Sequence, residues 1–173
     1  MTTAVATSVI AGEVEVLRTQ AAAIHRILRR NLDGLSQEDT LIQPAPGGNC
    51  ANWVVGHLVR TCELMLPVLN QQPVLGVEAL KRYDRGSAEL RNPAEAMPIE
   101  QLLSAWDEAN ARLDAGLAAL TPEHLDERAP FSPRNNPDET VRSLLTIVMF
   151  HQAYHCGQTA LHRRMAGKEG AIR

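Results

Sequence analysis

The chain has 173 residues, enough to bury a substantial core, and we expect residues 1–173 to form a single domain. Hydrophobic residues make up 45% of the chain but aromatic residues only 3%. The core must therefore be aliphatic, which favours packed helices over a β-sandwich. The formal net charge is -3, with basic residues scattered among acidic ones, so the composition argues against a nucleic-acid-binding face.

Sequence features also bear on the compartment. No run of about 18 apolar residues is present, so we expect no membrane-spanning segment. Residues 1–8 lack the positive start and apolar centre of a signal peptide. The cysteines, Cys50, Cys62 and Cys156, are odd in number and form no C-x-x-C pair, which argues against a disulfide framework. These features predict a protein of the reducing cytoplasm.

The first half of the chain contains two segments with the apolar spacing of amphipathic helices. We expect the first helix over residues 3–32, ending near Gly34. The second is expected over residues 50–70, after a loop rich in proline and glycine, with Asn49 as its N-cap. Their inward stripes comprise Ile10, Val14, Leu17, Ala21, Ile24 and Leu28, and then Val54, His57, Thr61, Leu64 and Val68.

The second half of the chain contains two more such segments. The third helix is expected over residues 98–120, with Pro98 in its first turn, and its stripe includes Leu103, Trp106 and Leu113. The fourth is expected over residues 138–166 and stops at Gly167. Residues 71–97 are the longest connection, with a short helix expected over 77–83. The chain is therefore predicted to be an all-α four-helix bundle with a long crossover connection.

The fourth helix has an inward stripe that changes from apolar to polar. Three or four imidazole and amide groups on a bundle seam need partners, because each unpaired buried polar group costs about 1–3 kcal/mol. The spacing leaves two interpretations: the polar end of the seam is open to water, or it is organised around a ligand. The stripe comprises Val141, Leu144, Val148, His151, His155, Gln158 and His162.

A divalent metal is the ligand that this pattern favours. His151 and His155 are four residues apart, so their rings leave one helix face one turn apart. His57 lies on the seam of the second helix, after Gly56, whose missing side chain would allow close helix approach. Neutral imidazoles bind Zn, Ni, Cu or Fe well. We therefore predict a metal site at His57, His151 and His155; the alternative is that these histidines bond backbone carbonyls.

Other polar residues have weaker assignments. Gln158 and His162 are candidates for contact with a substrate, and Gln158 is also placed to orient a metal ligand. We expect His162 to be partly exposed near its helix end. Glu63 lies about 120° around the helix from His57 and is not assigned to the site. Gln152 stands where the H-E-x-x-H motif of zinc peptidases has its glutamate base, which disfavours that activity.

Two segments resemble motifs of the DinB/YfiT-like superfamily of metalloenzymes. They are NWVVGHL at residues 52–58 and HQAYHCGQ at residues 151–158, the latter followed by RRMAG at 163–167. The resemblance implies a four-helix bundle with a long crossover, metal ligands at His57, His151 and His155, and commonly a homodimer. Members with assigned activity are transferases that use low-molecular-weight thiols such as bacillithiol or mycothiol, or a thiol-dependent isomerase.

The sequence thus predicts a metal-dependent enzyme, with thiol S-transfer as the first hypothesis. The ion would be Zn or Ni, with Fe and Mn as further candidates, and the partner a small molecule that includes such a thiol. One alternative is a non-enzymatic, stress-linked, metal-binding dimeric bundle. Another is a bundle that keeps the histidines without binding metal tightly. A metal-dependent hydrolase is less favoured.

Overall fold

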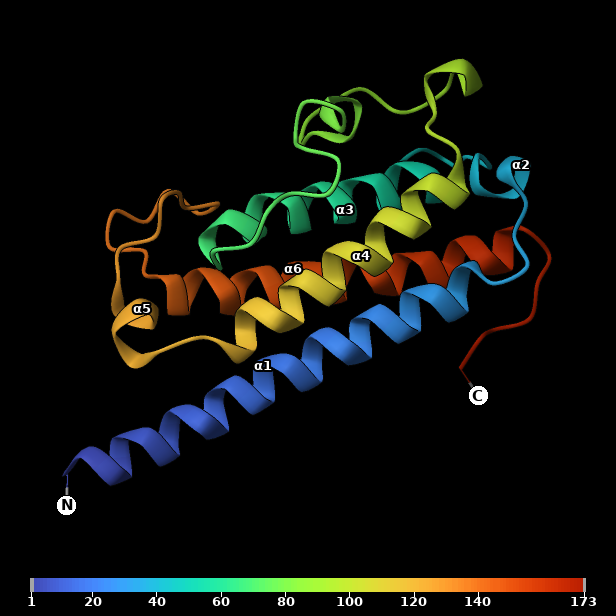
Figure 1. The fold of residues 1–173 in the computed structure, drawn as a ribbon. Coiled ribbons are helices and arrows are strands. Elements are labelled where there is room, and N and C mark those ends of the chain that lie inside the picture. The colour runs from blue at the N-terminus through green and yellow to red at the C-terminus, as the bar shows by residue number, and fades with distance from the viewer. Residues whose placement is uncertain (1, 173) are drawn as a thin grey trace.

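Four long helices pack side by side in the computed structural model, which describes residues 2–172, with side chains from residue 12 onward (Figure 1). α1 packs on α4 and α6, and α3 packs on the same two helices. No β-strand forms within residues 2–172, where one isolated bridge joins Arg128 and Thr140. The predicted all-α four-helix fold is confirmed. The four helices are α1 (Thr2–Leu32), α3 (Ala51–Val68), α4 (Ile99–Ala118) and α6 (Val141–Met165).

The connection between α3 and α4 is a long crossover. Because these two helices run parallel, residues 69–98 must return the chain along the bundle before α4 begins (Figure 1). The crossover contains two single-turn 3-10 helices, η1 (Lys81–Tyr83) and η2 (Pro93–Glu95). The helix expected over 77–83 is therefore only a turn followed by η1.

The buried carboxylate of Glu63 fixes the start of the crossover. Glu63 projects from α3 and is 1% exposed. It accepts backbone N–H groups of Val74, Leu75 and Gly76 at 3.0–3.1 Å. Charge-assisted bonds of this kind are stronger than neutral ones. Glu63 therefore ties the crossover to the middle of the bundle and has a structural role.

The core between the helices is aliphatic, as the composition predicts. Most described side chains of the α1 and α4 stripes are buried, including Leu28, Leu113 and Trp106, whereas Val14 is only half-buried; the side chain of Ile10 lies outside the described residues. Asn110 is a polar member of the α4 stripe, and its amide donates to the carbonyl of Trp106 at 2.8 Å.

Helix starts differ from the sequence expectation by one to three residues. α3 begins at Ala51 with Cys50 as its N-cap, and α4 begins after Pro98. α6 begins at Val141 rather than residue 138, because Thr140 and Ser143 form a reciprocal capping box. The loops also hold two short helices that were not predicted, α2 (Gln37–Thr40) and α5 (Pro122–Asp126).

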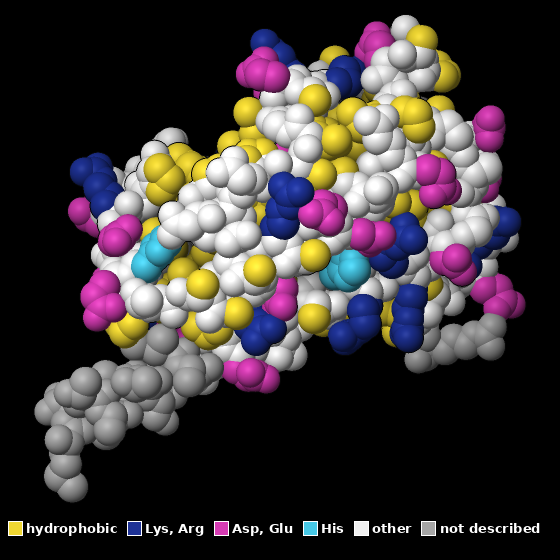
Figure 2. Space-filling view, viewed as in Figure 1, with side chains coloured by type: hydrophobic (Ala, Val, Ile, Leu, Met, Phe, Trp, Pro, Cys, Tyr) yellow, Lys and Arg dark blue, Asp and Glu magenta, His cyan; other side chains and the backbone are white. Residues whose placement is uncertain are grey.

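Charged side chains of both signs are interspersed on the surface. Figure 2 shows Lys and Arg side chains alternating with Asp and Glu across one face. No helix within residues 2–172 combines the length and apolarity needed to cross a membrane. Cys50, Cys62 and Cys156 are all buried and unpaired.

Candidate metal centre

Three histidines from two antiparallel helices converge in one place. His57 comes from the middle of α3, and His151 and His155 come from successive turns of α6. One ring nitrogen from each lies within 4.8 Å of the others, and the Nε2 atoms of His57 and His151 are 3.1 Å apart. Ligand nitrogens about 2.0–2.1 Å from a tetrahedral ion stand roughly 3.3 Å apart. The cluster therefore has the dimensions of a site for one metal ion.

Contacts outside the cluster fix the orientation of His57. Its Nδ1 lies 2.8 Å from the carbonyl oxygen of Tyr83. A carbonyl can only accept, so Nδ1 carries the proton and the Nε2 lone pair points into the cluster. The indole of Trp53 stacks on the ring, with centroids 4.8 Å apart and planes 13° apart. His57 is therefore held in the tautomer and position that a metal ligand needs.

His155 is oriented in the same way by Gln158. Its Nδ1 lies 2.7 Å from the Gln158 side-chain oxygen, which leaves its Nε2 free to bind. The Nδ1 of His151 is buried and has no hydrogen-bond partner among the described residues. Two of the three imidazoles therefore have an outer partner.

The environment keeps the three imidazoles neutral. Burial is the largest cause in each case, and it lowers the pKa of His57, His151 and His155, that of His151 to about 4. Nearby positive charge lowers the pKa of His57 and His151 further. At neutral pH the three imidazoles are thus uncharged, which is the form that binds a metal ion. Three neutral imidazoles suit Zn, Ni, Cu or Fe.

Gly56 has a role different from the one expected. A Cβ built at this position would lie 2.3–2.5 Å from three ring carbons of Tyr83. The missing side chain therefore makes room for the crossover rather than for a neighbouring helix. Tyr83 is 1% exposed, its hydroxyl donates to Asn52 Oδ1 at 3.0 Å, and it accepts from the Met97 amide at 2.8 Å. This packing places the Tyr83 carbonyl against His57.

A cavity of about 540 Å³ opens directly onto the histidines. Its walls come from α3, α6, the crossover and the loop over residues 127–140. Arg60 and Arg85 are the charged residues of its described lining, which contains no Asp or Glu. The cavity is thus apolar with a basic edge. Its main apolar lining comprises Trp53, Leu64, Met65, Phe131, Ile147 and Phe150.

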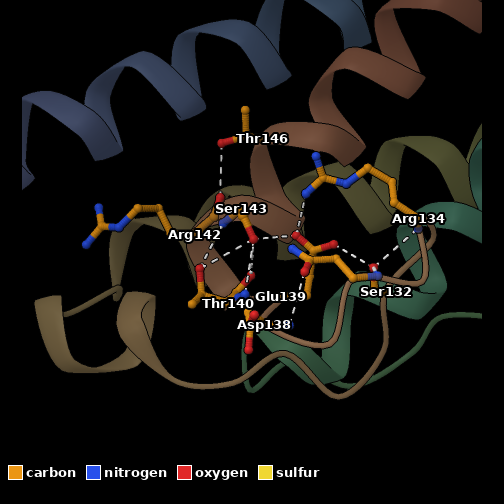
Figure 3. A network of polar contacts seen from close by, with 9 residues as sticks. Ser132, Arg134, Asp138, Glu139, Thr140, Arg142, Ser143 and Thr146 are labelled. Carbon is orange, nitrogen blue, oxygen red and sulfur yellow. Dashed lines mark hydrogen bonds and ion pairs between the residues drawn. The ribbon is translucent and has the colours of Figure 1, made fainter.

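A polar network anchors the loop over residues 127–140, which supplies Phe131 to the cavity. The carboxylate of Glu139 accepts from Ser132 Oγ at 2.6 Å, from Arg134 Nη2 at 2.7 Å and from the Ser143 hydroxyl (Figure 3). The hydrogen bonds from Ser132, Ser143 and Arg134 lower the pKa of Glu139 to about 2. The network joins the loop to the first turn of α6.

The remaining sequence candidates lie outside the histidine cluster. His162 is buried rather than partly exposed, and its Nε2 lies 2.9 Å from the Asn49 carbonyl oxygen. Gln152 is fully buried, and its amide contacts Cys62 Sγ at 3.2 Å. His25 pairs with a surface aspartate on α4. Cys156 is a small core residue that is 3% exposed.

Sequence analysis missed Arg60, Arg85 and Glu139. Arg60 is three residues after His57 and forms an ion pair with Asp84 of the crossover. Arg85 and Glu139 lie in long connections, where helical periodicity gives no information about position. Arg60 could have been found from its spacing, because residues three apart on a helix are neighbours and Arg60 follows His57 by three.

Comparison with known proteins agrees with this architecture. The crystal structure of a conserved protein from Enterococcus faecalis matches this chain with a TM-score of 0.68 and 19% identity, over 89% of this chain and 97% of that one. At that identity the likeness shows the fold alone. No curated protein matches the chain. Residues 20–159 match the DinB superfamily, so the chain belongs to that superfamily.

Proposed function

We propose that His57, His151 and His155 hold a divalent metal ion, with Zn or Ni as the first candidate and Fe or Mn as the next, and that the protein is an enzyme that uses it. The observation that carries this proposal is the cavity of about 540 Å³ that opens on the histidines. Three protein ligands leave at least one coordination position for a substrate atom, which is typical of catalytic rather than structural sites.

The reaction that we propose is transfer of a thiol sulfur to an electrophile. A bound divalent ion lowers the pKa of a thiol and so supplies thiolate at neutral pH. The sulfur then forms a bond to an electrophilic carbon, the leaving group departs with its electron pair, and the thiol proton passes to solvent. The apolar walls around Trp53 and Phe131 would hold the electrophile and exclude water from the histidines.

The lining of the cavity favours thiol transfer over hydrolysis. Hydrolysis by a zinc peptidase mechanism uses a glutamate as general base. No Asp or Glu of the described residues lines this cavity, and Gln152, in the position of that glutamate, is buried against Cys62. A thiol whose pKa is lowered needs no such base. Gln158 supports the proposal by orienting His155, and contact of Gln158 or His162 with substrate remains a prediction.

We also propose that the protein is a cytoplasmic homodimer. Three buried, unpaired cysteines are compatible with a reducing compartment. Phe150, Tyr154 and Leu161 are 60–66% exposed along α6, where a second copy would cover them. Light scattering of the purified protein would test the assembly, and a monomer at micromolar concentration would contradict it.

Elemental analysis of the untagged protein tests the metal site. We expect about one equivalent of metal in wild type and in the surface control His25→Ala, and none in His155→Ala. The loaded proteins are then assayed with a panel of small thiols and chlorodinitrobenzene. Turnover that depends on His155 would support the enzyme, and metal without turnover would favour the non-enzymatic alternative. A wild-type protein that binds neither Zn nor Ni would refute the metal site.

A further inference from the structure

The two arginines of the cavity differ in how their charge is balanced. Arg60 lies one turn beyond His57 on α3 and is paired with Asp84. Arg85 lies on the crossover and is exposed. Among the side chains of residues 12–172 it has no carboxylate partner, and its one hydrogen bond is from Nη1 to the Pro133 carbonyl at 3.4 Å. The Arg85 guanidinium therefore keeps most of its donors available.

Arg85 belongs to the cavity and not only to the outer surface of the protein. Arg85 lines the same 540 Å³ space as the histidines, and its weak bond to Pro133 reaches across to the loop over residues 127–140. A hydrogen bond at 3.4 Å is beyond the usual range and is easily exchanged for a better acceptor. No carboxylate in the described lining competes for it.

We infer that the cavity selects small molecules with an apolar body and one carboxylate, which the Arg85 guanidinium binds at the rim. The inference rests on the proposed function, because the other end of such a molecule would lie at the histidines. The planar fork of Arg donates two parallel hydrogen bonds to a carboxylate, and the apolar body matches the lining by Trp53, Phe131 and Ile147. A few placed polar groups in an apolar cavity are what fix a ligand's orientation.

The test compares 4-phenylbutyrate with its neutral isostere 4-phenylbutyramide. Each is titrated by calorimetry into the full-length protein, with and without zinc. The variants are Arg85→Gln and the control Arg26→Gln, an exposed arginine of α1 that does not line the cavity. We expect wild type and the control to bind the carboxylate about 10-fold more tightly than the amide. In Arg85→Gln that preference disappears while amide binding is retained.

Three results would overturn the inference: equal affinity for the two ligands in wild type, failure to bind either, or a preference that survives in Arg85→Gln. A preference that exists only with zinc and survives in Arg85→Gln would show that the carboxylate binds the metal instead. Because Arg85 acts at the rim, the preference should persist without zinc. A wild type that takes up no zinc but prefers the carboxylate would refute the metal-dependent function and still support this inference.

Discussion

Substituting Gly56 by alanine tests the link between the crossover and the candidate metal centre. The new Cβ would lie 2.3 Å from the nearest ring carbon of Tyr83, whereas ordinary carbon contacts are about 3.5 Å or more, so the ring must move by about 1.2 Å. Overpacking of this size costs about 1–3 kcal/mol, and each hydroxyl bond lost costs about 1 kcal/mol more. Alanine has a higher helix propensity than glycine, which stabilises the variant by about 1 kcal/mol. If both hydroxyl bonds are lost, we expect a net loss of about 2–4 kcal/mol.

Urea unfolding of the metal-free protein measures this loss, and competition with a chelator measures zinc affinity. Displacing Tyr83 also removes its carbonyl from His57, so we expect zinc to bind about 10-fold more weakly. Gly157→Ala is the matched control, because this glycine of α6 has open space where its Cβ would lie. The control should gain up to about 1 kcal/mol. If Gly56→Ala matched the control in both measurements, the packing argument would be refuted.

Three further substitutions probe single contacts. Glu63→Gln should lower the free energy of unfolding in urea by about 2 kcal/mol, because an amide cannot accept the crossover N–H groups as the carboxylate does; an unchanged value would contradict that role. Gln158→Leu should weaken zinc binding about 10-fold with little change in metal-free stability, measured by the same chelator competition. Glu139 has a folded pKa of about 2 against an ordinary 4.5, so the unfolded chain binds the proton more readily between these values. Its contribution to stability is therefore present above about pH 4.5 and is lost as the pH falls towards 2. In Glu139→Gln that part of the acid dependence should be missing from urea titrations repeated down to about pH 3; identical profiles would contradict it.

The sequence predicted the features that depend on spacing within a helix. His151 and His155 are on one face because they are four residues apart, and His57 is on the seam of the helix that packs against them. The polar end of the α6 stripe required a partner, and Gln158 contacts the Nδ1 of His155, as a group that orients a ligand would do. These inferences needed only periodicity and the cost of unpaired buried groups.

Features that depend on contacts between distant parts of the chain could not be predicted from periodicity in the sequence. Tyr83 reaches the site through its packing on Gly56 and its hydroxyl bonds to Asn52 and Met97. No local pattern marks these contacts, or a carboxylate such as Glu63 that accepts backbone N–H groups eleven to thirteen residues away. His162 was expected near solvent because it approaches a helix end, but the loop carbonyl of Asn49 covers it. The α6 helix begins later than the apolar pattern indicates, because Thr140 caps it and so fixes its first residue at Val141.

The histidines and most of the cavity wall stand on α3 and α6, whereas the crossover and the loop over residues 127–140 contribute a smaller part of the wall. Helix positions in a core tolerate few changes, while surface connections tolerate substitution and changes of length. Substitutions in these two connections can therefore change the lining of the cavity without disturbing the three histidines. A mutagenesis library aimed at new substrates should randomise Arg85, Gly86, Phe131 and Pro133 and leave α3 and α6 untouched. The helices thus keep the histidines in place, and the two connections are the part of the site that can vary.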